Sequence, residues 1–253
     1  MKLRYVTCSD PREYNGIKSI ISLARLPHAE IAVQCHPSKM SKGMPRNIWF
    51  EQLLHEFKQI DRVKLAIHIN NEWAQDICTK GIIPDIIYDW MKIEKSHNRP
   101  LIKRIQLNMS QNTADNIDIN GLHAIFYEFR HTEFIFQYND KTKDAIEKLH
   151  KSGARFSLLF DASGGNGVSP ENWEKPVYDE HTMGYSGGLS PTNVVQNLKK
   201  IEKMVPEGQD IWIDAEGKLK SNDDLFDNKP KFDPELAKVY VRKANLWQRQ
   251  KLR

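Results

Sequence analysis

Cysteine is scarce in this sequence, and long apolar runs are missing. The 253 residues include only three cysteines, Cys8, Cys35 and Cys78, and an odd number with no paired spacing argues against a disulfide framework. The first residues hold no apolar stretch of the signal-peptide kind, and no apolar run approaches the ~20 residues that a membrane-spanning helix needs. We therefore expect a soluble, cytoplasmic protein with no membrane partner.

A large excess of charge of either sign is also missing. The 37 Lys and Arg residues and the 33 Asp and Glu residues are interspersed and leave a formal net charge of +4. No basic block with interleaved aromatic residues occurs, so nucleic acid is not an expected partner. No low-complexity segment and no linker rich in Pro, Gly and Ser divides the chain. We expect one domain over residues 1–253, and the sequence gives no indication of its oligomeric state.

What the sequence does contain is a regular alternation of short apolar runs and helical patterns. The strand-like runs are residues 3–7, 30–35, 63–70, 104–109, 133–138, 155–160, 183–186 and 210–213. The helical patterns are residues 11–24, 45–60, 82–93, 120–130, 142–151, 191–204 and 233–252, with only a short turn expected after Pro170. This alternation is typical of parallel βαβ units. Eight units in about 250 residues favour a single (β/α)8 TIM barrel over an open sheet.

Three helix starts carry a proline signal. Pro11, Pro45 and Pro191 stand where the first helical residue is expected, and Ser190 is a suitable N-cap. Residues 221–232, rich in Asn, Asp and Lys, are expected to form a surface loop before the last helix.

Polar residues follow nearly every predicted strand. In a barrel the chemistry lies at the carboxyl ends of the strands and in the loops that follow them, and a buried polar group without a partner costs free energy. The candidate substrate-binding residues at these positions are His36, Lys39, Lys42, Arg46, Asn70, Asn108 and Asp214. They are more polar residues than a purely structural barrel needs.

Glycines follow the last three predicted strands and suggest a phosphate site. Without a Cβ, a glycine lets backbone N–H groups approach an anion closely. Residues 187–191 also lead into a predicted helix, whose N-terminus favours anions. The alternative is that the glycines only make tight turns, and Glu216 would repel a phosphate unless it points away. The candidate phosphate-binding residues are Gly164, Gly165, Gly167, Gly187, Gly188 and Gly217.

Two strand-end residues are candidates for acid–base chemistry. A thiolate at Cys8 could remove a proton from carbon, and Asp161 could donate one to oxygen. The alternatives are that Cys8 is a small buried hydrophobic residue and that Asp161 caps a helix or braces a loop. His36 could be a base, a substrate contact or a structural histidine. Because His36 and His68 show no metal-ligand spacing, we expect no metal and no cofactor.

The same residues resemble motifs of the phosphoribosylanthranilate isomerase family. That family has a cysteine at the end of strand one, F-V-N-E after strand three, Q-L-H-G at strand four, L-L-D and G-G-T-G at strand six, and G-G-L-x-P-E-N-V at strand seven. The matching stretches here are residues 6–13, 68–72, 106–109, 158–161, 164–167 and 187–194, with Gly217 as the counterpart of the eighth loop.

The resemblance implies an Amadori-type isomerisation of a phosphorylated ribosyl amine. It implies that Cys8 is the base, that Asp161 is the acid and that the glycine loops hold the phosphate. The family also has an arginine after strand two that holds a carboxylate; here the turn reads residues 36–39, and only Lys39, Lys42 or Arg46 could replace it. A lysine offers a point charge in place of a bidentate fork.

Two other functions stay open at this point. The chain could be another sugar-phosphate isomerase or lyase on the same scaffold, or a non-catalytic barrel that binds a phosphorylated ligand. A retained Cys8 and Asp161 favour an enzyme, whereas the missing arginine favours a changed substrate. The fold alone does not decide between them.

Overall fold

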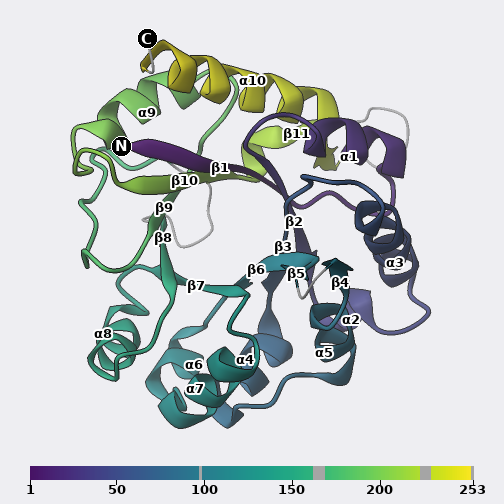
Figure 1. The fold of residues 1–253 in the computed structure, drawn as a ribbon, viewed down its shortest axis with the longest axis vertical. Helices are drawn as coiled ribbons and strands as arrows, with labels where there is room; N and C mark the ends of the chain where they lie inside the picture. The colour runs from purple at the N-terminus through teal and green to yellow at the C-terminus, as the bar shows by residue number, and fades with distance from the viewer. Residues whose placement is uncertain (97–98, 162–168, 223–228, 252–253) are drawn as a thin grey trace. The chain divides into compact units, whose positions relative to one another are not determined.

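The structure, a computed structural model, is a closed barrel of eight strands (Figure 1) and describes residues 1–96, 99–161, 169–222 and 229–251. The order around the barrel is β1-β10-β9-β8-β7-β6-β3-β2, and the registered pairs are parallel. The barrel strands are β1 (Lys2–Ser9), β2 (Ala29–Cys35), β3 (Leu65–Ile69), β6 (Ile102–Leu107), β7 (Glu133–Tyr138), β8 (Ser157–Asp161), β9 (Met183–Ser186) and β10 (Asp210–Ala215). The predicted (β/α)8 TIM-barrel fold is confirmed.

Helices follow most of the strands. They are α1 (Ile17–Ala24), α2 (Pro37–Met40), α3 (Pro45–Lys58), α4 (Asn71–Lys80), α5 (Asp85–Met91), α6 (Gln111–Asp115), α7 (Ile119–Glu128), α8 (Lys143–Lys151), α9 (Val194–Glu202) and α10 (Pro234–Lys251). Among the described residues between β8 and β9 none is helical. No helix within the described ranges is long and apolar enough to cross a membrane.

Several predicted helix boundaries need correction. Pro45 does begin α3, but α1 begins at Ile17 and not at Pro11. Helix α9 begins at Val194 with Asn193 as its N-cap, so Ser190 and Pro191 belong to the preceding turn. The predicted loop at 221–232 includes a short hairpin, β11 (Lys220–Asn222) with β12 (Pro230–Phe232). A second hairpin joins β4 (Glu94–Ser96) to β5 (Arg99–Pro100).

The contacts divide the chain into two compact units, residues 1–32 with 160–253, and residues 33–159. In the first unit β10 pairs with β1 on one side and β9 on the other, and α10 contacts α9, α1 and β1 (Figure 1). In the second unit β6 pairs with β3 and β7. One domain over residues 1–253 stays a prediction.

Aromatic packing shows which strand face of the first unit meets the helices. The rings of Phe160 and Tyr185 pack on Trp173, with centroids 6.1 and 5.7 Å away. Trp173 in turn donates a hydrogen bond from Nε1 to Asn197 of α9 at 3.2 Å. Because helices lie outside a barrel and successive strand residues alternate faces, Phe160 and Tyr185 point outward. The neighbouring side chain on β8, Asp161, therefore points inward.

The inner face of the first unit is closed by a tryptophan over a glycine. Trp212 is paired with Gly184 across β10 and β9, and its side chain is only 1% exposed. A Cβ at Gly184 would lie 2.0 Å from the indole. Glycine is therefore required there so that the indole can fill the barrel.

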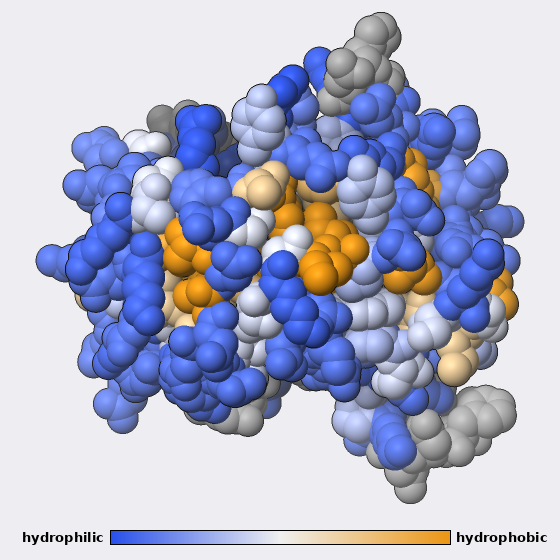
Figure 2. Space-filling view, turned by 90° about the horizontal axis from the view of Figure 1, so that it is seen from below, coloured by the Kyte–Doolittle hydropathy of each residue, from blue (hydrophilic) through white to orange (hydrophobic). Residues whose placement is uncertain are grey.

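The second unit shows the same division into two faces. Outward-pointing Phe134 and Phe136 meet Phe126 of α7. Inward-pointing Glu133 accepts a hydrogen bond from Ser157 at 2.7 Å and lies 3.5 Å from Arg104. Polar and charged side chains thus lie on the inner face of this unit. The surface seen in Figure 2 is mostly hydrophilic, with hydrophobic residues near its middle.

Candidate functional site

Two carboxylates point inward at the carboxyl ends of β8 and β10. Asp161 is 4% exposed and Asp214 is 6% exposed. Asp214 lies beside Ser186 of β9 in the strand register, and Ser9 of β1 donates a hydrogen bond to its Oδ1 at 2.6 Å. Since β9 lies between β8 and β10, the two aspartates are separated by two strand spacings, about 10 Å between Cα atoms. That separation fits a small sugar between two acid–base groups.

Cys8 does not share this inner face. Its neighbours Thr7 and Ser9 point inward, where they donate hydrogen bonds to Glu30 and Asp214, so Cys8 points outward by alternation. It is fully buried. Burial first, and then the charges of Asp214 and Glu30, raise the pKa of the Cys8 thiol well above its ordinary value.

The expectation of a thiolate at the barrel mouth is therefore corrected. In β1 the two residues on either side of Cys8 face the barrel interior, so Cys8 faces the helices. Burial also raises the pKa of Tyr240 on α10, and Cys8 and Asp214 raise it further. Burial and the two nearby carboxylates favour the neutral thiol of Cys8 over the thiolate, the form that acts as a nucleophile.

The turn after β9 contains two glycines with positive φ. Gly187 has a φ of 121° and Gly188 a φ of 58°, values that side chains rarely allow. Asn193 holds this turn, because its Nδ2 donates to the Gly188 carbonyl at 2.9 Å and its Oδ1 accepts from Ser190 N at 2.8 Å. The turn enters α9, whose N-cap residue makes no side-chain capping bond. Backbone N–H groups at such a helix start favour an anion.

Of the other predicted phosphate glycines, the structure describes only Gly217. Gly164, Gly165 and Gly167 lie outside the described residues. Gly217 begins a 3₁₀ turn, and a Cβ there would meet open space without a positive φ. Nothing in the geometry of Gly217 requires glycine.

A buried ion cluster, missed by the sequence analysis, holds the loops that follow β1 and β10. Asp10 is fully buried with a left-handed φ of 76°. It pairs with Arg12 through two contacts, at 2.6 and 2.8 Å, and with Lys220 at 2.9 Å. Lys220 also pairs with Glu216 at 3.1 Å. Glu216, the carboxylate that seemed discordant beside a phosphate, is thus neutralised by a lysine.

In the second unit, the residues proposed to replace the missing arginine differ in burial. Lys39 of α2 and Lys42 are exposed, whereas Arg46 at the start of α3 is 6% exposed. Burial raises the pKa of Cys35, at the end of β2, and the Arg46 charge lowers it in part. Arg46 is thus the one of the three that lies buried near a strand end. His36 precedes α2, and its Nδ1 lies 3.3 Å from Asn71 Nδ2.

Asn70 and Asn108 join one hydrogen-bonded network at the carboxyl ends of β3 and β6. Asn108 Nδ2 donates to Asn70 Oδ1 at 2.7 Å, and Gln106 Nε2 donates to Asn108 Oδ1 at 2.8 Å. Asn70 Nδ2 in turn donates to Gln34 Oε1 at 2.8 Å. The sequence placed Asn70 and Asn108 at strand ends but gave no sign that Gln34 joins them, because these partners lie 36 to 38 residues apart.

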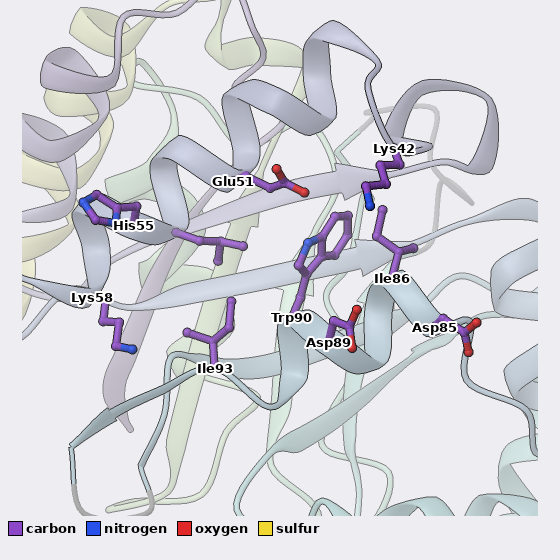
Figure 3. A pocket seen from close by; sticks show the side chains of 10 residues that line it. Lys42, Glu51, His55, Lys58, Asp85, Ile86, Asp89, Trp90 and Ile93 are labelled. Atoms are coloured by element: carbon purple, nitrogen blue, oxygen red, sulfur yellow. The ribbon is translucent and has the colours of Figure 1, made fainter.

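A pocket of about 570 Å³ lies on the helical side of the second unit. Figure 3 shows the Trp90 indole of α5 directed toward α3, which carries Glu51. Lys42 lines this pocket, so it lies by a groove between helices and not at a strand end. The remaining lining residues are Leu54, His55, Lys58, Asp85, Ile86, Asp89 and Ile93.

The chain matches no protein-family model and no curated protein sequence. The barrel fold is consistent with an enzyme or with a ligand-binding protein.

Proposed function

We propose that this protein is an isomerase-type acid–base enzyme for a small phosphorylated sugar-type substrate. The observation that carries the proposal is the pair of inward carboxylates, Asp161 and Asp214, on either side of β9, the strand that is followed by Gly187 and Gly188. Acid–base catalysis needs a donor and an acceptor on two sides of the reacting atoms. A nearby anion site would fix the substrate by its phosphate.

In this proposal the phosphate binds to the backbone N–H groups of the 187–188 turn and the start of α9. Asp161 donates a proton to the ring oxygen of a phosphorylated ribosyl amine, the C1′–oxygen bond breaks, and the amine nitrogen supplies the electron pair. Asp214 then removes the C2′ proton, and the resulting enol-amine tautomerises to the ketose. Ser9 orients Asp214 through its 2.6 Å hydrogen bond.

The base differs from the one that the family resemblance implies. That resemblance assigns the base to Cys8, but a buried, outward-pointing thiol with a raised pKa is poorly suited to remove a proton at the barrel mouth. Asp214 lies on the inner face and at the correct end of its strand. Its selection as base distinguishes this proposal from the mechanism implied by the resemblance.

The test is turnover of enzymatically generated phosphoribosylanthranilate, followed by the loss of its anthranilate fluorescence. We expect turnover by the wild type and a loss of at least about 100-fold in Asp161→Asn and in Asp214→Asn. Thermal stability with ribose 5-phosphate and with ribose tests the phosphate site separately. Stabilisation by the phosphate ester without turnover would indicate the non-catalytic binding protein, and absence of both effects would overturn the proposal.

A further inference from the structure

In the amide network of the second unit, the contacts of Asn70 decide which amide groups donate and which accept hydrogen bonds. Asn70 Nδ2 faces the backbone carbonyls of His68 at 2.9 Å and Cys35 at 3.3 Å. Carbonyls only accept, so the nitrogen of this amide must point at them and its oxygen must point the other way. The Asn70 oxygen can then only accept, which makes the facing atom of Asn108 the nitrogen.

The donor and acceptor roles at Asn108 also fix those at Gln106. Asn108 has used its nitrogen on Asn70, so its oxygen faces Gln106 and accepts from Gln106 Nε2. The amide nitrogen of Gln106 is thus committed, and its Oε1 is left as an acceptor. Reversing any one amide in this series would bring two acceptors or two donors together.

Gln106 Oε1 is buried and has no hydrogen-bond partner among the described residues. The residue is only 3% exposed, and it points to the inner side of the barrel, like Arg104 two residues earlier on β6. A buried acceptor of this kind is costly unless something donates to it. The network therefore orients an acceptor toward a group that the described residues do not supply.

The opposite end of the network is neutral. Gln34 Nε2 lies 3.3 Å from His68 Nδ1. Because Gln34 Oε1 already accepts from Asn70, its nitrogen donates, and Nδ1 of His68 must be the unprotonated acceptor. His68 is therefore the neutral tautomer with its proton on Nε2, and the network carries no charge.

From this we infer that the carboxyl ends of β2, β3 and β6 form a recognition site for a neutral O–H or N–H donor, bound by Oε1 of Gln106. Carboxylates and phosphates offer acceptors only and do not suit this position. Hydroxyl and carboxamide groups do. The inference goes beyond the proposed reaction and does not depend on it, since it rests on residues 34–108 alone.

The experiment is an NMR titration of protein with ¹⁵N-labelled Gln and Asn side chains, using ribose, benzamide and benzoate. We expect ribose or benzamide to shift the Gln106 side-chain signal and benzoate to leave it unchanged; which neutral probe binds identifies a hydroxyl or an amide as the donor. An equal effect of benzoate would overturn the inference. So would the absence of any effect of both neutral probes, which would mean that a water molecule alone satisfies Gln106.

The matched variants are Gln106→Met and Gln137→Met. The first removes the acceptor at nearly constant volume. The second removes a strand-end amide on β7 that makes no side-chain hydrogen bond to the network among the described residues. Affinity for the neutral probe should fall about tenfold in the first variant and stay unchanged in the second. Equal affinity in both variants would contradict the assignment. If Gln106→Met fails to fold, the wild-type titration still decides the question.

Discussion

Asp10 combines a strained backbone with a fully buried charge, and the surrounding cations explain how both persist. Burial alone would raise its pKa, but the hydrogen bonds and charges of Arg12 and Lys220 outweigh burial and lower it from 3.8. Arg12 is 38% exposed and Lys220 is 16% exposed. Water therefore partly screens the ion pairs of Asp10 with Arg12 and Lys220. The pair with Lys220 connects the loop after β1 to the loop after β10.

Replacing Asp10 with Asn tests this charge while keeping a residue that tolerates a left-handed φ. We expect the free energy of unfolding to fall by about 1–3 kcal/mol at neutral pH, because two cations lose their partner. A carboxyl with a lowered folded pKa stabilises the fold above its unfolded pKa, and that contribution is lost as the pH falls through the folded pKa. Denaturant unfolding should therefore show that wild type loses its advantage over the variant between about pH 5 and pH 2. A difference that does not change with pH would contradict the role of the charge.

Cys8 is expected to behave as a core residue. Cys8→Ala should leave turnover unchanged and cost about 1 kcal/mol of stability, because the side chain is fully buried and points away from the inner face of the barrel. In the native protein, iodoacetamide should fail to label Cys8, because its raised pKa keeps the thiol protonated. Rapid labelling of native Cys8, located by peptide mass spectrometry, would show that a thiolate is present after all.

Close packing between β9 and β10 depends on one glycine. Gly184→Ala would place a methyl group 2.0–2.4 Å from the Trp212 indole, so we expect a loss of about 3 kcal/mol or more in chemical denaturation. Gly217→Ala is the matched control, because its Cβ meets open space at an ordinary φ. Similar stabilities for the two variants would mean that Trp212 does not fill the barrel beside Gly184.

The hairpin of β11 and β12 is attached to the segment before α1. Tyr14 OH accepts a hydrogen bond from Phe232 N at 2.9 Å, and Asn15 Nδ2 donates to the Phe232 carbonyl at 3.0 Å. Tyr14→Phe should cost about 1 kcal/mol and speed hydrogen exchange of the Phe232 amide, while amides of α3 keep their wild-type rates. Unchanged exchange at Phe232 would show that this bond does not hold the hairpin.

Most of the barrel could be predicted because short apolar runs and the helical patterns between them are local signals. Helix α4 was missed because it begins directly after a strand at Asn71, a non-glycine residue with a φ of 54°, and its buried stripe is short, limited to Ala74, Ile77 and Cys78. Pro11 suggested a helix start, but proline also suits the turn that precedes α1.

The orientation of site residues was harder to predict, because alternation makes neighbouring side chains face opposite sides of a strand but does not say which of them faces inward. Asp161 and Asp214 were placed correctly at strand ends, whereas the outward direction of Cys8 followed only from its bonded neighbours Thr7 and Ser9. The pairings of Asp10 with Lys220 and of Gln34 with Asn70 join residues far apart in the chain. Such partners leave no local pattern in a single sequence.

The most direct test of the account compares Asp214→Asn with Cys8→Ala in the phosphoribosylanthranilate fluorescence assay. Both residues lie near the same strand ends, but only the aspartate points into the barrel. The account predicts that the Asp214 variant loses turnover and that the Cys8 variant keeps it. Loss of turnover in Cys8→Ala, with Asp214→Asn still active and both variants folded, would contradict it.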